Sequence, residues 1–463
     1  WTERDEPQAA IGSHLHRLAY PKNHEFHLNK NGSILKEAYH HHGKGEVLDL
    51  LLRGEYLYAA CGKAGFVVFD VANVDNKGFS ERIVTAPVSM LGQRVFVETK
   101  YATSVVSPST LALDPLRNRL PENEEQAIGL NYGFIYVTDL EEGIVAVLAA
   151  TLLDGIPSNN FFKKEDVVRF NPNGVLNGAT HGYMAGTRLY VVCTAGIAVV
   201  DVTDPRNPKL LSAPIPGVLR EPRKLAVQFQ HAFVTDADGV QVFNLTDPIH
   251  PRKIATVPLT DAQGIYAART YLYVADGPKG LAIVDIKNPA SPKLHSHFTA
   301  DGLLNDTRAV QIGAINASMY GLVADGKNGL RVLQLISPEN QPNFMGFSPE
   351  PKPKLIATYP TKGEAVAVSR GLDRDRVVDE TGGQTVVFGR RGSRPFKEPE
   401  WMKFLQHADG TPYRVQDVVT QPDGTLTTTE GAALNPEPYV SPESAEQSEP
   451  TPRARLERRP ARK

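Results

Sequence analysis

Cysteine is scarce in this sequence, and long hydrophobic runs are missing. The 463 residues include two Cys, too few for a disulfide scaffold or a four-thiolate zinc site, and neither lies in a CxxCH haem-attachment motif. No run approaches the roughly 18 apolar residues that are needed to span a bilayer. These absences exclude haem attached covalently to this stretch and indicate a soluble chain.

Charge of one sign is also lacking. Lys plus Arg number 50 against 52 Asp plus Glu, so the formal net charge is −2 and there is no global basic field for collecting nucleic-acid phosphates. The sequence contains no G-x-S-x-G nucleophile elbow, no GxxxxGK[ST] phosphate loop and no HExxH zinc helix. A nucleic-acid binder is therefore not expected, and the common hydrolase and nucleotide-binding classes are disfavoured.

The chain starts at Trp1 rather than at Met. We expect that processing or truncation has removed a preceding segment, which leaves room for a signal peptide, a membrane anchor or an upstream domain. Hydrophobic residues make up 41% of the chain, enough for a large core.

Internal repeats dominate the middle of the sequence. Three segments align closely: LYVVCTAGIAVVDVTDPRNPKLL from Leu189, AFVTDADGVQVFNLTDPIHPRKI from Ala232 and LYVADGPKGLAIVDIKNPASPKL from Leu272. Weaker copies begin at Leu57, Ile135, Tyr320 and Val377. Equivalent strand ends are 43 residues apart from Asp201 to Asn244 and 41 from Asn244 to Asp285, a period typical of propeller blades.

Each unit has the pattern of a β-hairpin followed by a turn. The first apolar run ends at a small polar position, and a Gly follows three or four residues later. Asp at a strand end can bind the turn backbone, and Gly supplies the positive φ of a tight connection. The polar position is occupied by Cys61, Asp139, Cys193, Asp236, Asp276, Asp325 and Asp379; the Gly positions are Gly65, Gly143, Gly196, Gly239, Gly280, Gly329 and Gly383. Because Cys61 and Cys193 belong to non-neighbouring units, we expect buried free thiols rather than a disulfide.

An Asp/Asn-Pro-x-x-Pro segment then turns the chain after the second run, and no helix of ordinary length fits between the runs. Short β units at this period predict an all-β fold, a β-propeller. Seven units predict seven blades; six stay open as the alternative, because the last copy lacks the Asp-Pro-x-x-Pro tail.

The repeats also divide the chain into regions. We expect residues 1–45 to form an irregular, His-rich N-terminal lead, residues 46–395 the propeller, residues 396–435 a C-terminal extension and residues 436–463 a disordered tail with a basic end. About one blade length of extra sequence separates the first two units. We place it at residues 82–130, as a loop or extra hairpin at one rim of the propeller.

Phrases such as IAVVDV from Ile197 and LAIVDI from Leu281, each followed by Asp/Asn-Pro-x-x-Pro-Lys, resemble the LVIVD repeat of bacterial and archaeal extracytoplasmic β-propellers. The resemblance covers roughly residues 46–390. It implies a periplasmic, cell-surface or secreted location and a binding or scaffolding role, in some members joined to multihaem cytochrome modules. The family supplies no catalytic residues to assign.

Histidine is concentrated before the first blade. Seven of the 13 His lie in the first 42 positions: His14, His16, His24, His27, His40, His41 and His42. Imidazole binds transition metals and haem iron, so these side chains are candidate ligands for a metal, or for haem c held by a missing upstream segment. The spacing matches no strict zinc signature, which favours the alternative interpretation of a solvated polar lead.

A second candidate site follows from the fold. The inner strand of each blade lines the central channel, and the residues opening these strands predict a polar ring at one mouth: Glu46, His181, Arg223, Gln263, Arg308 and Glu364. Such a ring can bind a polar ligand. Two Glu and two Arg would largely neutralise each other, which favours a ring of ion pairs that plugs the channel.

Two main functional hypotheses result. The favoured one is a noncatalytic, extracytoplasmic bacterial scaffold that binds a protein or a surface polymer through rim loops, with a membrane contacted only through a missing anchor or the basic tail. The competing one is the propeller portion of an extracytoplasmic multihaem electron-transfer protein with His ligands in its N-terminal lead. An enzyme with its site at the channel mouth is a weaker third.

Overall fold

The computed structural model describes residues 45–53, 56–70, 96–108, 130–153, 162–315, 318–341 and 348–369, with short pieces between 390 and 428. The chain divides into two compact units, Trp1–Tyr413 and Arg414–Lys463. In the second unit, β27 (Val418–Thr420) pairs antiparallel with β28 (Leu426–Thr428). In the first unit, the two-stranded pair of β25 (Arg390–Arg391) and β26 (Arg394–Pro395) is separate from the large sheets.

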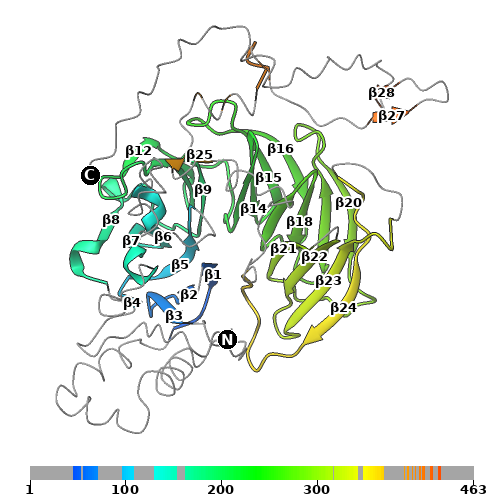
Figure 1. Ribbon diagram of the computed structural model, residues 1–463, viewed down its shortest axis with the longest axis horizontal. Helices are drawn as coiled ribbons and strands as arrows, with labels where there is room; N and C mark the ends of the chain where they lie inside the picture. Colours follow the sequence, from blue (N-terminus) through cyan, green and yellow to red (C-terminus); the bar gives the residue numbers. More distant parts are fainter. Residues whose placement is uncertain are drawn as a thin grey trace, which may run out of the picture. The chain divides into compact units, whose positions relative to one another are not determined.

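The described part of the first unit contains six four-stranded antiparallel sheets, and each uses four consecutive strands of the chain (Figure 1). Blade 1 consists of β1 (Asp49–Arg53), β2 (Tyr56–Ala60), β3 (Phe66–Asp70) and β4 (Phe96–Val97). Blade 2 consists of β5 (Ala102–Val106), β6 (Phe134–Asp139), β7 (Gly143–Leu148) and β8 (Val167–Phe170). Blade 3 consists of β9 (His181–Ala185), β10 (Arg188–Cys193), β11 (Gly196–Asp201) and β12 (Lys209–Ser212).

The other three sheets follow the same order. Blade 4 consists of β13 (Leu225–Gln228), β14 (His231–Asp236), β15 (Gly239–Asn244) and β16 (Arg252–Pro258). Blade 5 consists of β17 (Ile265–Ala268), β18 (Tyr271–Ala275), β19 (Leu281–Asp285) and β20 (Lys293–Phe298). Blade 6 consists of β21 (Ala309–Ile315), β22 (Ser318–Ala324), β23 (Leu330–Ile336) and β24 (Lys354–Tyr359). Short 3₁₀ helices lie in connections: η4 (Leu130–Gly133), η5 (Ala150–Leu153), η7 (Lys164–Asp166) and η8 (Pro172–Gly174).

The all-β propeller architecture is confirmed, but seven blades are not supported. The described residues form six four-stranded sheets, which agrees with the six-bladed alternative. Most of the seventh candidate unit, from Val377, lies outside the described residues. After β24 the described chain returns to the centre: Ala365 bridges Gly326 of blade 6, and the Leu52 amide of blade 1 donates a 2.8 Å hydrogen bond to Ser369 Oγ.

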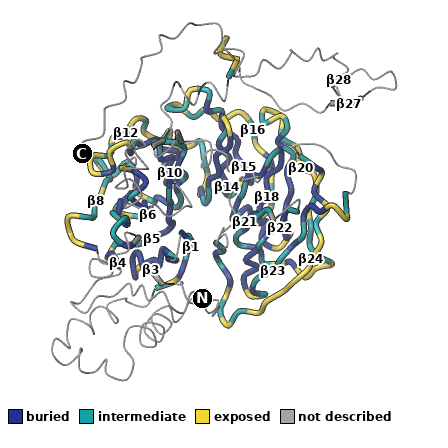
Figure 2. The backbone as a smooth tube through the Cα atoms, in the orientation of Figure 1, coloured by how far each residue is buried: buried dark blue, intermediate teal, exposed yellow. Residues whose placement is uncertain are grey.

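Successive blades bury alternating side chains against each other. In β6, Ile135 and Val137 join the hydrophobic cluster shared with blade 1, whereas Phe134 and Tyr136 join the cluster shared with blade 3. The same two-residue alternation divides β10 and β18 between the clusters on either side. Because both faces of these strands are buried, their sequences are continuous apolar runs (Figure 2).

The strand order gives the propeller two different faces. On one face, which we call the hairpin face, lie the hairpins between the second and third strands and the segments that lead into the next inner strand. On the other, which we call the turn face, lie the hairpins between the first and second strands and the Asp/Asn-Pro-x-x-Pro turns. Each inner strand therefore runs from the hairpin face to the turn face.

The extra sequence between the first two units is not one block at residues 82–130. That range contains β4 and β5, the last strand of blade 1 and the first strand of blade 2. The additional length falls in two connections, residues 71–95 between β3 and β4 and residues 107–133 between β5 and β6. Both connections begin and end at the turn face of neighbouring blades. Within the described ranges, no helix is long and apolar enough to cross a membrane.

Candidate functional site

Buried aspartates hold the segments that lead into the inner strands. Asp139 and Asp236 end the second strands of their blades, Asp276 and Asp325 directly follow theirs, and all four are at most 1% exposed. Each accepts a hydrogen bond from a backbone amide of the lead-in segment of the same blade; the donors are the amides of Tyr101, Arg220, Asp261 and Asp306. These carboxylates therefore fix the start of each inner strand.

The predicted turn capping is confirmed for two of these aspartates. Asp139 Oδ1 accepts the amide of Glu141 at 2.9 Å, and Asp236 Oδ1 accepts the amide of Asp238 at 2.9 Å. Cys193 stands at the same position in blade 3, where its buried thiol lies 3.5 Å from the Gly196 carbonyl oxygen. Both cysteines are buried and free, as the sequence predicted.

The six residues of the predicted ring do not share one register. The amides of Arg223, Gln263 and Arg308 donate equivalent 2.8 Å hydrogen bonds to the second strands of their blades, and the amide of Leu48 does the same in blade 1. Glu46 therefore precedes the equivalent position by two residues. His181 follows it by one, because Thr180 makes the corresponding amide contact with Val192.

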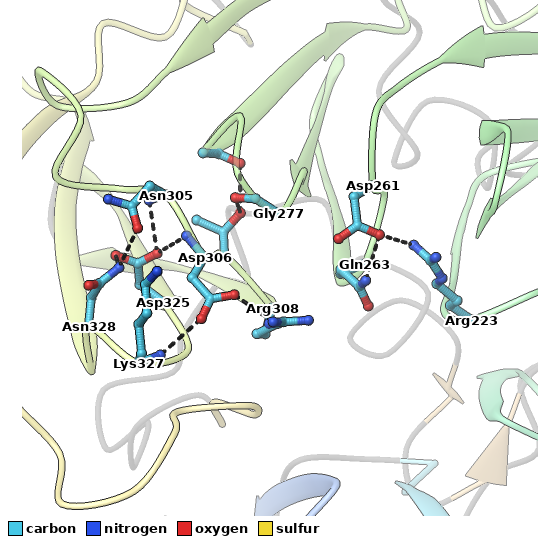
Figure 3. A network of polar contacts seen from close by, with 12 residues as sticks. Arg223, Asp261, Gln263, Gly277, Asn305, Asp306, Arg308, Asp325, Lys327 and Asn328 are labelled. Carbon is cyan, nitrogen blue, oxygen red and sulfur yellow. Dashed lines mark hydrogen bonds and ion pairs between the residues drawn. The ribbon is translucent and has the colours of Figure 1, made fainter.

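Asp261 joins two of the predicted residues across a blade boundary. Its Oδ1 lies 2.8 Å from Arg223 Nη1 of blade 4 and accepts a 2.8 Å hydrogen bond from Gln263 Nε2 of blade 5 (Figure 3). Arg223 Nη1 also donates to the Ala262 carbonyl oxygen at 2.8 Å. Asp261, which the ring prediction omitted, is thus the acceptor that holds Arg223.

Asp306 occupies the corresponding position in blade 6, where it pairs with an arginine of its own blade. Its Oδ1 lies 2.6 Å from Arg308 Nη2, and its Oδ2 accepts the Lys327 amide at 3.1 Å (Figure 3). Gly326 makes this approach feasible, because a Cβ there would lie 2.1 Å from Asp306 Oδ2. The D-x-[QR] spacing shared by Asp261 and Asp306 is a signal that the sequence already contained.

Glu46 and Glu364 fall at the position of Asp261 and Asp306 rather than at that of the arginines. The isolated bridge from Gly326 to Ala365 matches the one from Gly277 to Thr307, so Glu364 corresponds to Asp306. Both glutamates are exposed at the hairpin face. The polar mouth therefore has two levels: an outer level of carboxylates and an inner level that includes the arginines.

A second polar cluster lies one step further along the inner strands. Asp49, Ser104, His181 and Lys224 occupy one register near the start of the inner strands of blades 1 to 4. Asp49 Oδ2 accepts hydrogen bonds from Ser104 Oγ at 2.6 Å and from the Val105 amide at 3.1 Å, and Asp49 Oδ1 lies 3.5 Å from Lys224 Nζ. Lys224 of blade 4 thus contacts blade 1. Sequence reasoning selected only His181 from this cluster.

The electrostatics of this cluster fix its protonation. Burial would raise the pKa of Asp49, but the positive charge of Lys224 and the two hydrogen bonds lower it below its ordinary value. Burial, followed by the charge of Lys224, lowers the pKa of His181 to about 3. His181 Nδ1 accepts the Leu225 amide at 3.2 Å, so the neutral ring carries its proton on Nε2. The cluster is a fixed ion pair beside a neutral imidazole.

The His-rich lead, residues 1–44, lies outside the described residues, and with it His14, His16, His24, His27, His40, His41 and His42. In the part of the chain that the structure describes, no group of three or more His, Cys, Asp or Glu side chains could hold a metal ion. The metal and haem hypotheses stay predictions.

The LVIVD-like segments form paired turns at the turn face. The side chains of Asp201, Asn244 and Asp285 each accept the amide two residues ahead at 2.7–2.8 Å. In the Asp/Asn-Pro segment that follows, Asp204 and Asp247 repeat this contact at 3.0 Å. The motif residues therefore stabilise the turns and leave no side chain with an evident catalytic role.

Comparisons with known proteins agree with this architecture. The LVIVD repeat profile matches residues 44–85 and 260–300, so this β-propeller carries LVIVD repeats, as the resemblance predicted. No curated protein matches the sequence.

The comparison with solved structures gives similarities at low sequence identity. The β-propeller domain of Myceliophteria thermophila Cps50 (Swd1) is 11% identical, with a TM-score of 0.41 over 70% of this chain and 89% of that chain. The RRP9 WD40 repeats are 10% identical, with a TM-score of 0.42 over 71% and 84%. BamB from Moraxella catarrhalis is 12% identical, with a TM-score of 0.36 over 62% and 69%.

Proposed function

We propose that this protein is a noncatalytic, extracytoplasmic binding scaffold that presents loops from a rigid propeller. The LVIVD repeats support the location, because the propellers they resemble act outside the bacterial cytoplasm. The rigid frame follows from the site: the carboxylates and arginines at the channel mouth are used to tie lead-in segments and neighbouring blades together. The proposed partner then contacts the connections between strands.

The observation that carries the proposal is the position of the long connections. The first-to-second-strand hairpins of blades 3, 4 and 5 have two connecting residues, whereas the equivalent connection in blade 2 spans residues 107–133. Residues 71–95 lengthen the turn-face connection of blade 1. Two long connections thus start from one face of adjacent blades, where one partner can contact both.

The proposed partner is a protein or surface polymer. A photo-crosslinking amino acid at Asn118, within the 107–133 connection, tests this in cells of the native source. Lys279, an exposed residue at the hairpin face, is the control position. The proposal predicts one discrete adduct from Asn118 and none from Lys279, and loss of complex formation when residues 109–129 are replaced by a short Gly-Ser linker.

Two outcomes would count against the scaffold. One is the absence of adducts from positions 75–90 and 109–129 alike. The other is a haem or copper absorption spectrum that disappears on replacing the seven N-terminal histidines, which would favour the electron-transfer alternative.

A further inference from the structure

The outermost strands of blades 3 to 6 carry basic residues and no acidic residue. β12 begins at Lys209, β16 begins with Arg252 and Lys253, β20 begins at Lys293 and β24 begins at Lys354. All five residues are exposed, and none of them forms an ion pair with another described residue. We call these four strands the outer belt; it holds positive charge that no nearby carboxylate neutralises at ion-pair distance.

The belt also exposes apolar side chains at a repeated irregularity. The pairing between the third and fourth strands shifts by one residue at the same place in blades 3, 4, 5 and 6. The extra residue of the outer strand is Leu211, Ile254, His295 or Ile356, and the three aliphatic residues are 37–46% exposed. A bulge turns a side chain away from the regular pleat. In blades 3, 4 and 6 the bulge therefore sets an exposed aliphatic side chain close to the basic start of its strand, whereas His295 in blade 5 packs against the ring of Tyr271.

Protection of a free sheet edge explains only part of this pattern. Lysines and bulges on edge strands discourage pairing with another edge, and one of each per strand suffices for that purpose. It does not require the exclusion of Asp and Glu from all four strands, nor exposed Leu and Ile beside the charges. Carboxylates occur nearby in the Asp-Pro turns, where Asp204 and Asp247 accept hydrogen bonds from their own turns.

We propose that the outer belt binds a linear acidic polysaccharide. Its carboxylates would pair with the basic residue that opens each outer strand, and its sugar faces would contact the exposed Leu and Ile side chains. This inference goes beyond the proposed function, because it adds a second binding surface that is separate from the long turn-face connections.

The placement of the belt favours a flexible chain over a flat or globular partner. The outer strands are the outermost members of four successive sheets, and exposed residues gather along them (Figure 2). Because each sheet projects outward in its own direction, a planar membrane reaches only neighbouring blades at once. A linear polymer can follow the wall and use the same cationic position on every blade, so that weak contacts add.

Binding of alginate oligosaccharides to the full chain tests the inference, with neutral dextran oligosaccharides and phosphatidylserine vesicles as the comparison probes. The belt variant replaces Lys209, Arg252, Lys293 and Lys354 with Gln. The control variant makes the same change in net charge at the hairpin face, by replacing the exposed residues Lys63, Lys100, Lys279 and Lys327 with Gln. Circular dichroism and thermal unfolding establish that both variants fold. If the quadruple belt variant does not fold, alginate binding is measured with the single Lys293→Gln variant instead.

The inference predicts that alginate binds, that its affinity falls steeply with added salt, and that the belt variant binds on the order of tenfold or more weakly while the control changes less than about twofold. Replacing Ile254 and Ile356 with Ser should weaken binding without changing the salt dependence. No alginate binding, equal binding of dextran, equal losses in both quadruple variants, or binding of vesicles alone would overturn it. The partner adduct at Asn118 is measured separately, so a failure here leaves the scaffold proposal to its own test.

Discussion

The hydroxyl of Tyr190 in blade 3 lies 2.8 Å from the carbonyl oxygen of Pro248, in the Asp-Pro turn of blade 4. This hydrogen bond ties the buried second strand of one blade to the LVIVD-type turn of the next. Tyr136, at the corresponding position in blade 2, is influenced by Asp201 and Asp204 of the blade 3 turn, which contribute to the rise in its pKa after burial. The repeat motif thus serves contacts between blades as well as the turn itself.

Replacing Tyr190 with Phe should lower the free energy of unfolding by about 1 kcal/mol, because the Pro248 carbonyl loses its donor. Tyr273 is a matched control, since its buried hydroxyl has no hydrogen-bond partner among the described residues. Tyr273→Phe should therefore leave stability unchanged or raise it. Urea unfolding of both variants measures the difference, and equal losses would show that the Tyr190 hydrogen bond contributes nothing specific.

The contact between Asp49 and Lys224 predicts a coupled effect on stability. Asp49→Asn and Lys224→Gln should each cost about 2 kcal/mol at neutral pH, because each leaves the partner charge without its counter-ion. The double variant should cost less than the sum of the two. Lys279→Gln is the exposed control and should cost little; additive losses for Asp49 and Lys224 would contradict the pairing.

The pH dependence of this contact has a definite sign. The pKa of Asp49 is lowered in the folded state, so its contribution to stability is present above the ordinary value of 3.8 and is lost as pH falls through the folded pKa. Wild-type protein should lose this contribution in acid, whereas Asp49→Asn should show a shallower loss over the same range. Unfolding midpoints measured from pH 5 to pH 2 or so compare the two.

His181 should remain neutral throughout the neutral and mildly acidic range. Its pKa is lowered to about 3 from an ordinary value of 6.5, so between these values the unfolded state binds a proton that the folded state does not. Stability should therefore decrease as pH falls through this window, and less so in His181→Asn, which keeps an acceptor for the Leu225 amide. The histidine NMR signal that is absent from the His181→Asn variant is assigned to His181. In the wild-type protein this signal should show no titration near pH 6.5, and a titration midpoint there would contradict the prediction.

Both cysteines should be unreactive in the folded protein. Cys61 and Cys193 are buried, and burial raises the pKa of Cys61 to about 12 and also raises that of Cys193. A thiol reagent should label neither before unfolding and both after it. Lys279→Cys, at an exposed hairpin position, provides the reactive control; rapid labelling of wild type would contradict the buried placement.

The side chain of Asp325 should contribute far more to the free energy of unfolding than that of an exposed aspartate. It is fully buried and receives the Asp306 amide at 2.9 Å, Asn328 Nδ2 at 3.0 Å and Arg331 Nε at 3.2 Å. Asp325→Ala should cost about 3–5 kcal/mol, since Arg331 loses its counter-ion. Asp204→Ala, in an exposed turn, should cost about 1 kcal/mol or less. Similar losses in the two variants would contradict this placement.

Hairpins were predictable from the sequence because they combine two local signals, an apolar run and an Asp or Cys followed by Gly. Inner strands were not, because β5, with the sequence ATSVV, has no repeat residue to mark it inside the expected insertion. The residues at the channel mouth likewise have no repeated residue type that marks their register. Leu48, Thr180 and Arg223 occupy one register but share no chemical type, so Glu46 and His181 were placed beside the arginines instead.

The side-chain contacts between blades could not be predicted from the sequence. Arg223 was selected for its position, but its acceptor Asp261 belongs to the next blade, and Lys224 meets Asp49 of a blade far away in the sequence. Such pairs depend on how the sheets pack around the channel.

The most direct test of the binding-scaffold account is the optical absorption spectrum, with metal analysis, of the protein purified from its native source. The account predicts a colourless, metal-free protein that purifies with a stable partner. Haem bands or bound copper that disappear when His14, His16, His24, His27 and His40, His41 and His42 are replaced would contradict it and establish the electron-transfer alternative.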